Sequence, residues 1–268
     1  LDANTTASSN TAMGYSALGA NTTADNNTAV GHNALTAAST AASNTVMGSL
    51  AGDAVTTGGG NTIVGKSAGG AVTTGTQNTL IGHAAGDALT EGHYNIIIGY
   101  VSDVSAVTGS SQFVLGNGVT CVGDGNFTFG DGTTDSNIAN GATTITAPSD
   151  VRLKEDIEDE VVGLDFINDL RPVTFRWKKG KDVPEDMVAH KADSEERVMD
   201  GKYNHGFIAQ EVKEVIDQHP DIKDGFDMWT EDEVDGRQRI GEGALIPMLT
   251  KAVQELSAEI EKLKKEQN

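Results

Sequence analysis

Basic residues are scarce in this 268-residue chain, which has 19 Lys and Arg against 39 Asp and Glu and a formal net charge of −20. A chain this acidic repels phosphate backbones and anionic headgroups, so we expect neither a nucleic-acid partner nor docking on anionic lipid. No stretch approaches the roughly 18 apolar residues of a membrane-spanning helix. We therefore expect no membrane insertion.

Cysteine is almost absent as well. The single Cys121 excludes a disulfide framework within the chain and any zinc site built from several cysteines. We interpret Cys121 as a small core residue. The sequence suggests no metal site and no cofactor.

The charge that is present is unevenly distributed. Residues 1–148 contain 9 of the 39 acids, one basic residue (Lys66), 24 of the 32 glycines and no proline before Pro148. Residues 149–268 contain the remaining 30 acids, 18 bases and both tryptophans. We therefore predict two domains, 1–148 and 149–268. The first has too few large apolar side chains to offset the entropy of folding alone, so it is either disordered or gains a core by repetition and oligomerisation.

A repeat of 17 residues runs through the first domain. Its blocks have the form Asn-Thr/Ile, two apolar residues and Gly, and they begin at Asn10, Asn27, Asn44, Asn61, Asn78 and Asn95. QFVLG follows in phase at Gln112, whereas NFTFG at 126–130 breaks the period and predicts a cap or exit. A second register of alanines lies three residues after the glycines of the first five blocks, at Ala17, Ala34, Ala51, Ala68 and Ala85.

A repeat this short fits one coil of a β-solenoid. A short apolar strand would end at the glycine, which permits the positive φ of a corner, and stacking would align each asparagine over the next. With only two large apolar side chains per coil facing inward, the core of one chain would be thin, so we infer that three chains share it in a trimeric shaft. The repeats resemble the head repeats of trimeric bacterial adhesins and of some phage tail fibres.

The residue after each block glycine defines a stripe along the predicted shaft. It consists of Tyr15, His32, Ser49, Lys66, His83 and Tyr100. We interpret this stripe as solvated or packed, and ligand binding remains the alternative.

The second half predicts a mixed α/β domain. Residues 161–178 predict a short amphipathic helix, a stop at Pro172 and a strand, and 178–203 predict an exposed loop. The stretch 203–220 predicts a strand entering a helix, and 224–245 predicts a hairpin.

The tail, at about 244–267, predicts a long helix with a heptad seam. The seam residues alternate steps of three and four: Ile246, Leu249, Val253, Leu256, Ile260 and Leu263. A lone amphipathic helix packed on its own domain shows the same pattern. We favour an intermolecular coiled coil because the seam continues to the polar C-terminus.

The domain border contains a serine and a lysine five residues apart, Ser149 and Lys154. A lysine can take the proton of a serine hydroxyl only when burial or a nearby cation lowers its pKa, and Arg152 is one such cation. The spacing alone indicates nothing more than a solvated start to a charged domain.

Three features nevertheless resemble the C-terminal intramolecular chaperone domain of phage tailspikes, tail fibres and endosialidases, classed as peptidase family S74. They are S-D-x-R-L-K-x-x-I at 149–157, GFIAQEV at 206–212, and the C-terminal heptad helix. The resemblance covers about 149–268.

The resemblance implies a homotrimer that brings the upstream shaft into register and then cuts its own chain between Pro148 and Ser149. Ser149 would be the nucleophile and Lys154 the base, in a single-turnover reaction. Supporting roles carry over to Asp150 and Arg152, and to Gln210, Glu211 and His205 near the second motif. For the last three, a structural role is the alternative.

The sequence thus predicts the C-terminal part of a phage tail fibre or spike, located in the virion tail, whose shaft or upstream regions bind a host cell-surface receptor. The alternative is a trimeric bacterial adhesin with a non-cleaving trimerisation domain. A carbohydrate-degrading spike is disfavoured because the nine acids of the shaft are scattered.

Overall fold

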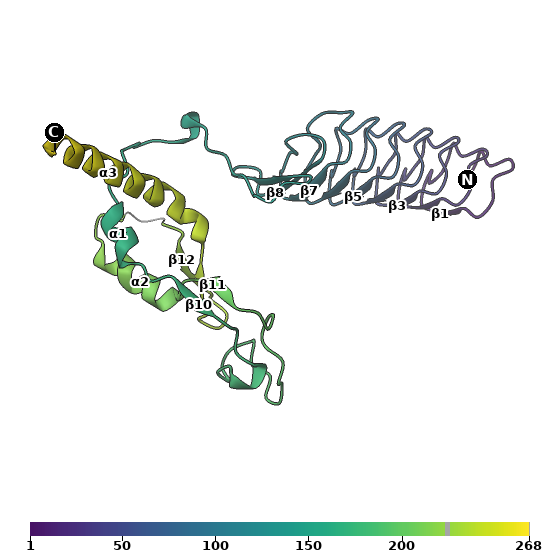
Figure 1. Cartoon of the computed structure of the whole chain (residues 1–268). Coiled ribbons are helices and arrows are strands. Elements are labelled where there is room, and N and C mark those ends of the chain that lie inside the picture. Colours follow the sequence, from purple (N-terminus) through teal and green to yellow (C-terminus); the bar gives the residue numbers. More distant parts are fainter. Residues whose placement is uncertain (223–225, 268) are drawn as a thin grey trace. The chain divides into compact units, whose positions relative to one another are not determined.

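The computed structural model describes residues 1–222 and 226–267, and the chain divides into two compact units, Leu1–Glu155 and Asp156–Asn268 (Figure 1). The first unit is a β-solenoid in which each coil contributes one short strand to a continuous sheet. The strands are β1 Thr11–Met13, β2 Thr28–Val30, β3 Thr45–Met47, β4 Thr62–Val64, β5 Thr79–Ile81, β6 Ile96–Ile98, β7 Phe113–Gly116, β8 Asn126–Gly130 and β9 Ser136–Ala139. The β-solenoid predicted from the repeat is confirmed.

The 17-residue period sets the register of this sheet. Strands β1 to β7 pair in parallel with the same repeat position in the next coil, as in Thr45 with Thr62. The NFTFG block is β8, which still pairs in parallel with β7 although its offset is only 14 residues, Phe113 to Phe127. Strand β9 then pairs antiparallel with β8. The change of direction ends the stack of parallel strands.

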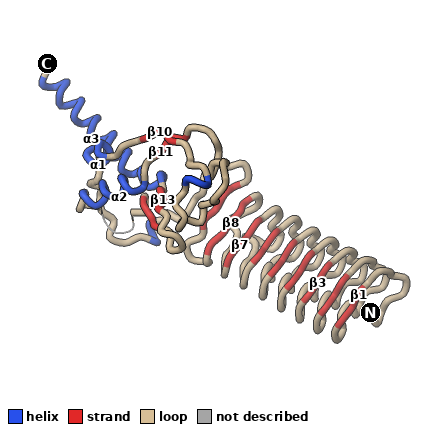
Figure 2. The backbone as a smooth tube through the Cα atoms, turned by 90° about the horizontal axis from the view of Figure 1, so that it is seen from below, coloured by secondary structure: helices blue, strands red, loops and turns tan. Residues whose placement is uncertain are grey.

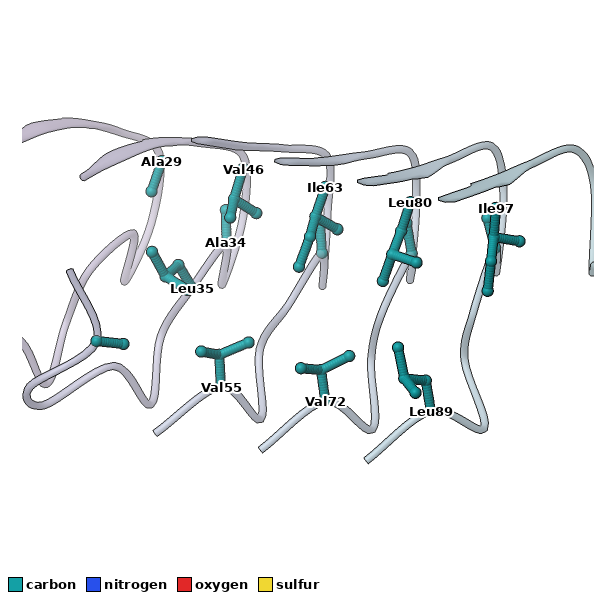
Figure 3. Packing of buried hydrophobic residues seen from close by; sticks show 14 of the residues in the cluster. Ala29, Ala34, Leu35, Val46, Val55, Ile63, Val72, Leu80, Leu89 and Ile97 are labelled. Atoms are coloured by element: carbon teal, nitrogen blue, oxygen red, sulfur yellow. The ribbon is translucent and has the colours of Figure 1, made fainter. Parts of the chain in front are cut away.

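The core of the solenoid is completed within one chain. In each strand the middle residue points inward, so Val46, Ile63 and Leu80 are fully buried. Figure 3 shows this row facing a second row that comes from the opposite side of each coil and includes Val55 and Val72. The sequence-based inference that a thin core must be shared among three chains is therefore wrong for this core, because the loops supply the second apolar residue.

Two loop positions fill the second row in turn. In the early coils Leu18 and Leu35 fill it from a left-handed backbone conformation, with φ of 51° and 52°. From the third coil on, Gly52 and Gly69 occupy that position and a residue three places later, such as Val55, fills the core instead. Glycine adopts this conformation without strain, whereas leucine does not. The core therefore stays filled along the solenoid, although the apolar side chain comes from a different loop position in the early and the later coils.

The remaining strand side chains point away from this core and form one surface, the strand face. Each strand contributes two outward residues, and Figure 2 shows the strands side by side along the coils. Paired strands join these residues into two ladders: Thr11, Thr28, Thr45, Thr62, Thr79, Ile96, Phe113 and Phe127; and Met13, Val30, Met47, Val64, Ile81, Ile98, Leu115 and Phe129.

The block asparagines form a buried hydrogen-bonded ladder, as the repeat predicted. The Oδ1 atom of Asn61 accepts bonds from the backbone N of Asn78 at 3.0 Å and from its Nδ2 at 3.1 Å. The Nδ2 atom of Asn61 donates to Asn44 Oδ1 at 3.1 Å and to the carbonyl oxygen of Gly75 at 2.9 Å. At Gln112, which replaces the asparagine, the backbone N still donates to Asn95 Oδ1 at 3.0 Å.

The block glycines form the predicted corners. From Gly14 to Gly116 their φ angles lie between 131° and 151°. A Cβ atom on Gly65, for example, would overlap the carbonyl oxygen of Gly82 in the next coil. Both the backbone angle and the close approach of the coils therefore require glycine.

Two smaller predictions about the shaft also hold. Cys121 is a buried core residue. The residues after the block glycines follow one another from coil to coil, since Tyr15 stacks on His32 with ring centroids 5.4 Å apart and His83 stacks on Tyr100 at 5.2 Å. Both tyrosines are exposed.

The second unit is a small mixed α/β domain. Its elements are α1 Leu164–Asp169, β10 Val173–Phe175, the 3₁₀ turn η2 Gly180–Asp182, β11 Asn204–Gly206, α2 Ala209–Gln218, β12 Trp229–Glu231, β13 Gln238–Ile240, the 3₁₀ turn η3 Glu242–Ala244 and α3 Leu245–Glu266. Strand β10 pairs with β11, and β12 with β13, both antiparallel. The predicted hairpin is formed by β12 and β13, while residues 224 and 225 of that prediction lie outside the described residues.

One apolar cluster holds this unit together. Phe166 of α1, Val212 of α2 and Met228 before β12 are buried in it, together with Leu245 and Met248 of α3. The predicted loop, residues 178–203, contains the short 3₁₀ turn η2 and an isolated β-bridge between Lys179 and Arg197, and is otherwise without helix or strand. No helix in the described ranges is long and apolar enough to cross a membrane.

The asparagine ladder predicts a specific loss of stability. We expect Asn61→Ala to destabilise the shaft by about 3 kcal/mol, because it leaves the buried Asn78 N–H and Gly75 carbonyl unpaired at about 1–3 kcal/mol each. Thermal unfolding followed by circular dichroism measures this. The matched control Asn117→Ala removes an exposed amide and should change stability by less than about 0.5 kcal/mol. Equal losses in both variants would contradict the ladder.

Asp103 predicts a pH dependence. Burial raises the pKa of its carboxyl from 3.8 to about 6, and the neighbouring Asp87 acts in the same direction. The folded chain therefore keeps this proton at a higher pH than the unfolded chain does. The stability that this group contributes is complete below about pH 4 and is lost as the pH rises to about 6.

The comparison of wild type with Asp103→Asn isolates this contribution. Asp124 lies in the same part of the shaft, and hydrogen bonds from Gln112 and Ser110 lower its pKa, so it acts in the opposite direction in both proteins. Between pH 4 and 6 the unfolding midpoint of wild type should fall relative to that of Asp103→Asn. Parallel curves would refute the assignment.

Candidate active site

Residues 149–154 fold into a single tight turn. Asp150 caps the short 3₁₀ turn η1, Val151–Leu153, by accepting a hydrogen bond from the backbone N of Arg152 at 2.9 Å. The backbone N of Lys154 then donates to the carbonyl oxygen of Val151 at 3.2 Å. Aspartate is a preferred cap because its carboxylate satisfies a backbone N–H that the turn leaves free. The turn brings the sixth residue back toward the first.

This turn places the two predicted reacting groups in contact. The Nζ atom of Lys154 donates a hydrogen bond to Ser149 Oγ at 2.7 Å. The distance lies within the range across which a nucleophile and its base exchange a proton. The arrangement is therefore chemically suited to activating the serine hydroxyl once the amine is neutral.

Asp150 and Arg152 form a bidentate pair beside the dyad. Arg152 Nε donates to Asp150 Oδ1 at 3.0 Å, and Arg152 Nη2 donates to Asp150 Oδ2 at 2.6 Å. The hydrogen bonds from Arg152 lower the pKa of the Asp150 carboxyl. Among the described side chains the guanidinium thus lies against Asp150 rather than Lys154, which argues for a positioning role in the turn.

The whole segment is exposed in the single chain. Every residue from 149 to 159 has an exposed surface. A lysine serves as a base only where burial or a nearby cation favours its neutral form. This segment has the contact that catalysis needs but not the surroundings.

The second motif, GFIAQEV, joins strand β11 to helix α2. Phe207 packs against the apolar cluster and Val212 lies inside it, so these residues have a structural role. Gln210 is exposed. The Arg171 guanidinium contacts the Glu211 carboxylate, with Nε 2.9 Å from Oε2, and lowers the pKa of that carboxyl.

His205 lies at a separate cavity of this unit. The cavity has a volume of about 420 Å³ and is lined by His205, Phe207, Pro172 and Glu242, among others. Sequence reasoning missed both Arg171 and Glu242. The pairing of Arg171 with Glu211 cannot be predicted from a local sequence pattern, because the two residues are 40 positions apart in the chain.

Residues 149–220 match the family model Peptidase_S74, described as chaperone of endosialidase. This part of the chain is therefore similar to a chaperone-of-endosialidase domain. This family consists of autoproteolytic intramolecular chaperones and implies trimerisation. No curated protein and no solved structure matches the chain.

The match begins at Ser149 and ends at Pro220, just beyond α2. It therefore contains both motifs, while the hairpin and α3 lie outside it. All the predicted site residues except Pro148 fall within the matched range. In the described ranges, no group of three or more histidine, cysteine or acidic side chains is arranged to hold a metal ion.

Helix α3 of the second unit has two apolar faces. Leu245, Met248 and Ala252 are buried and pack on the domain. The six seam residues predicted from the heptads lie elsewhere on the helix, and each is 43–66% exposed. The helix is thus packed on its domain through a set of residues that excludes the seam, which leaves the seam available.

Proposed function

We propose that this chain is the C-terminal part of a phage tail fibre or spike whose chaperone domain assembles three copies, registers the solenoid shaft and then cuts itself off between Pro148 and Ser149. The observation that carries the proposal is the contact between Lys154 Nζ and Ser149 Oγ within the matched motif. The virion tail is the proposed location, and a host cell-surface receptor is the proposed partner of the shaft or of regions upstream.

The reaction needs no other reactant than water. The Ser149 hydroxyl oxygen attacks the carbonyl carbon of Pro148 while its proton passes to the Lys154 amine. The bond between that carbon and the Ser149 nitrogen breaks, and Lys154 returns the proton to the departing amine. The resulting ester joins Pro148 to Ser149 Oγ. Water hydrolyses it to a Pro148 carboxylate and a free Ser149 hydroxyl.

Assembly supplies what the single chain lacks at this site. The dyad segment is exposed in one chain, so other copies must cover it if Lys154 is to act as a base. The exposed seam of α3 supports association of this kind, because apolar residues at heptad spacing are stabilised by packing against equivalent helices. Cleavage would then follow assembly and report it.

Cleavage also changes the stability of the shaft from thermodynamic to kinetic. Once the chaperone domain has left, an unfolded shaft has no device to align it again. Its lifetime then depends on the barrier to unfolding rather than on the equilibrium. A fibre that works outside the cell benefits from this arrangement.

The first test removes the nucleophile. Wild type should yield two fragments, the second beginning at Ser149, whereas Ser149→Ala and Lys154→Ala should remain at the full 27.9 kDa. Ser149→Cys keeps a nucleophile and should still be cut, and Lys178→Ala, which removes an exposed lysine elsewhere in the domain, is the matched control. Mass spectrometry reads every outcome. An intact wild type in folded trimers would favour the adhesin alternative.

The second test removes the seam. Val253→Asp combined with Leu256→Asp places charges at two exposed seam positions and should abolish both trimerisation and cleavage, because a coiled-coil core excludes unpaired charges. Gln254→Asp, on an exposed face beside the seam, is the control and should behave as wild type. Light scattering gives the mass, and electrophoresis gives the cut fraction. Efficient cutting by monomeric chains would refute the dependence on assembly.

A further inference from the structure

Within the shaft unit, the strand face is an uncharged surface on which no described residue of that unit packs. Its outward residues are threonines and apolar side chains, with Met13 66% exposed and Leu115 49% exposed. No acid or base occurs at the outward strand positions from β1 to β8, although the shaft segment contains nine acids. Like charge therefore does not oppose contact between two copies of this face.

The area of the face suits a stable interface. Such interfaces bury about 800 Å² per partner. Eight strands, each presenting two partly or largely exposed side chains, offer an area of that order. Exposed apolar surfaces of this size on soluble proteins mark interaction sites.

The face becomes more apolar toward its C-terminal end. In β1 to β5 one of the two outward residues is always threonine. In β6, β7 and β8 both are apolar, namely Ile96 with Ile98, Phe113 with Leu115, and Phe127 with Phe129. The two phenylalanines of β8 also pack on each other, with ring centroids 5.0 Å apart.

We propose that the strand face is the surface by which the shafts of three copies pack together. The shafts lie parallel with equivalent coils side by side, which we call the level arrangement, and the apolar end at β6 to β8 sets this register. The partner is a second copy of this chain, and the number of copies rests on the proposed function. Five coils that present the same threonine permit slips of one repeat. The three apolar strands occur once in the chain, so only the level arrangement places them together.

Cross-linking in the full-length chain tests the surface. With Cys121→Ser as background, Ile98→Cys places a single thiol on the strand face, and Thr74→Cys places one on an exposed loop of the same shaft as a matched control. A short bismaleimide should join Ile98→Cys chains at least fivefold more than Thr74→Cys chains. Equal or reversed yields overturn the proposal.

A mixed assembly tests the register. Chains with Ile98→Cys are co-expressed with chains of a different tag that carry Met47→Cys, three coils away on the same ladder. Level packing predicts links between identical positions and few mixed links. Mixed links as frequent as identical ones would overturn the register.

A charge placed either in the apolar strands or among the threonine-bearing strands tests whether the apolar end sets the register. Phe113→Asp should reduce the trimer fraction about tenfold or more, because an unpaired charge would be buried at the contact. Thr62→Asp, on the same ladder but among the threonines, should reduce it less than threefold. Both side chains point away from the core of their own coil, so circular dichroism should remain that of the shaft. Equal effects would refute a register-setting end.

The cleavage of wild type, read beside the cross-linking of the uncut Ser149→Ala variants, separates the two proposals. If wild type is not cut while Ile98→Cys chains still cross-link, the proposed function falls and the strand face stands. If wild type is trimeric and cut but Ile98→Cys does not cross-link, the strand face falls alone.

Discussion

The shaft depends on one constraint, which is that the buried polar groups of each coil are satisfied only by the coil next to it. Asn61 illustrates this, since its amide bonds Asn44 on one side and Asn78 on the other. An isolated coil would leave these groups unpaired in a dry interior, at a cost that its few apolar side chains do not offset. The coil is therefore not a folding unit, and stability comes only from the stack. The glycine corners follow from the same constraint, because the coils must approach closely enough for the ladder to form.

A stack built from equivalent coils is stable but ambiguous. Each coil offers the same hydrogen bonds as its neighbours, so the ladder itself does not distinguish the correct neighbour in another chain. The distinguishing features lie at the C-terminal side of the shaft, where Gln112 replaces the asparagine, the spacing shortens to 14 residues and β9 reverses direction. The chaperone domain follows this end in the chain. A device that aligns chains is most effective next to the part of the fibre whose side chains are not repeated.

The dyad segment combines local order with incomplete surroundings. A capped turn is enough to bring the Lys154 amine to the Ser149 hydroxyl, and it needs only six residues. The desolvation that changes the acidity of an amine needs a surface that the turn does not provide. Under the proposed function, the site has its geometry in the monomer and would be activated only when other copies cover it. In this scheme, a wrongly assembled fibre keeps its chaperone.

The sequence alone determined the features that are encoded locally or by repetition. The period of 17 predicted the coils, the asparagine ladder and the glycine corners, and the motif at 149–157 identified the family that residues 149–220 match. Only the tertiary structure decided which side of each strand faces the core, because both apolar residues of a block look alike in sequence. It also decided that Val55 and Leu35 fill equivalent places in the solenoid core and that Glu211 pairs with Arg171. It decided further that the seam of α3 is not the face packed on its own domain. These outcomes depend on contacts between residues far apart in the chain or on the direction of a side chain, which local pattern does not specify.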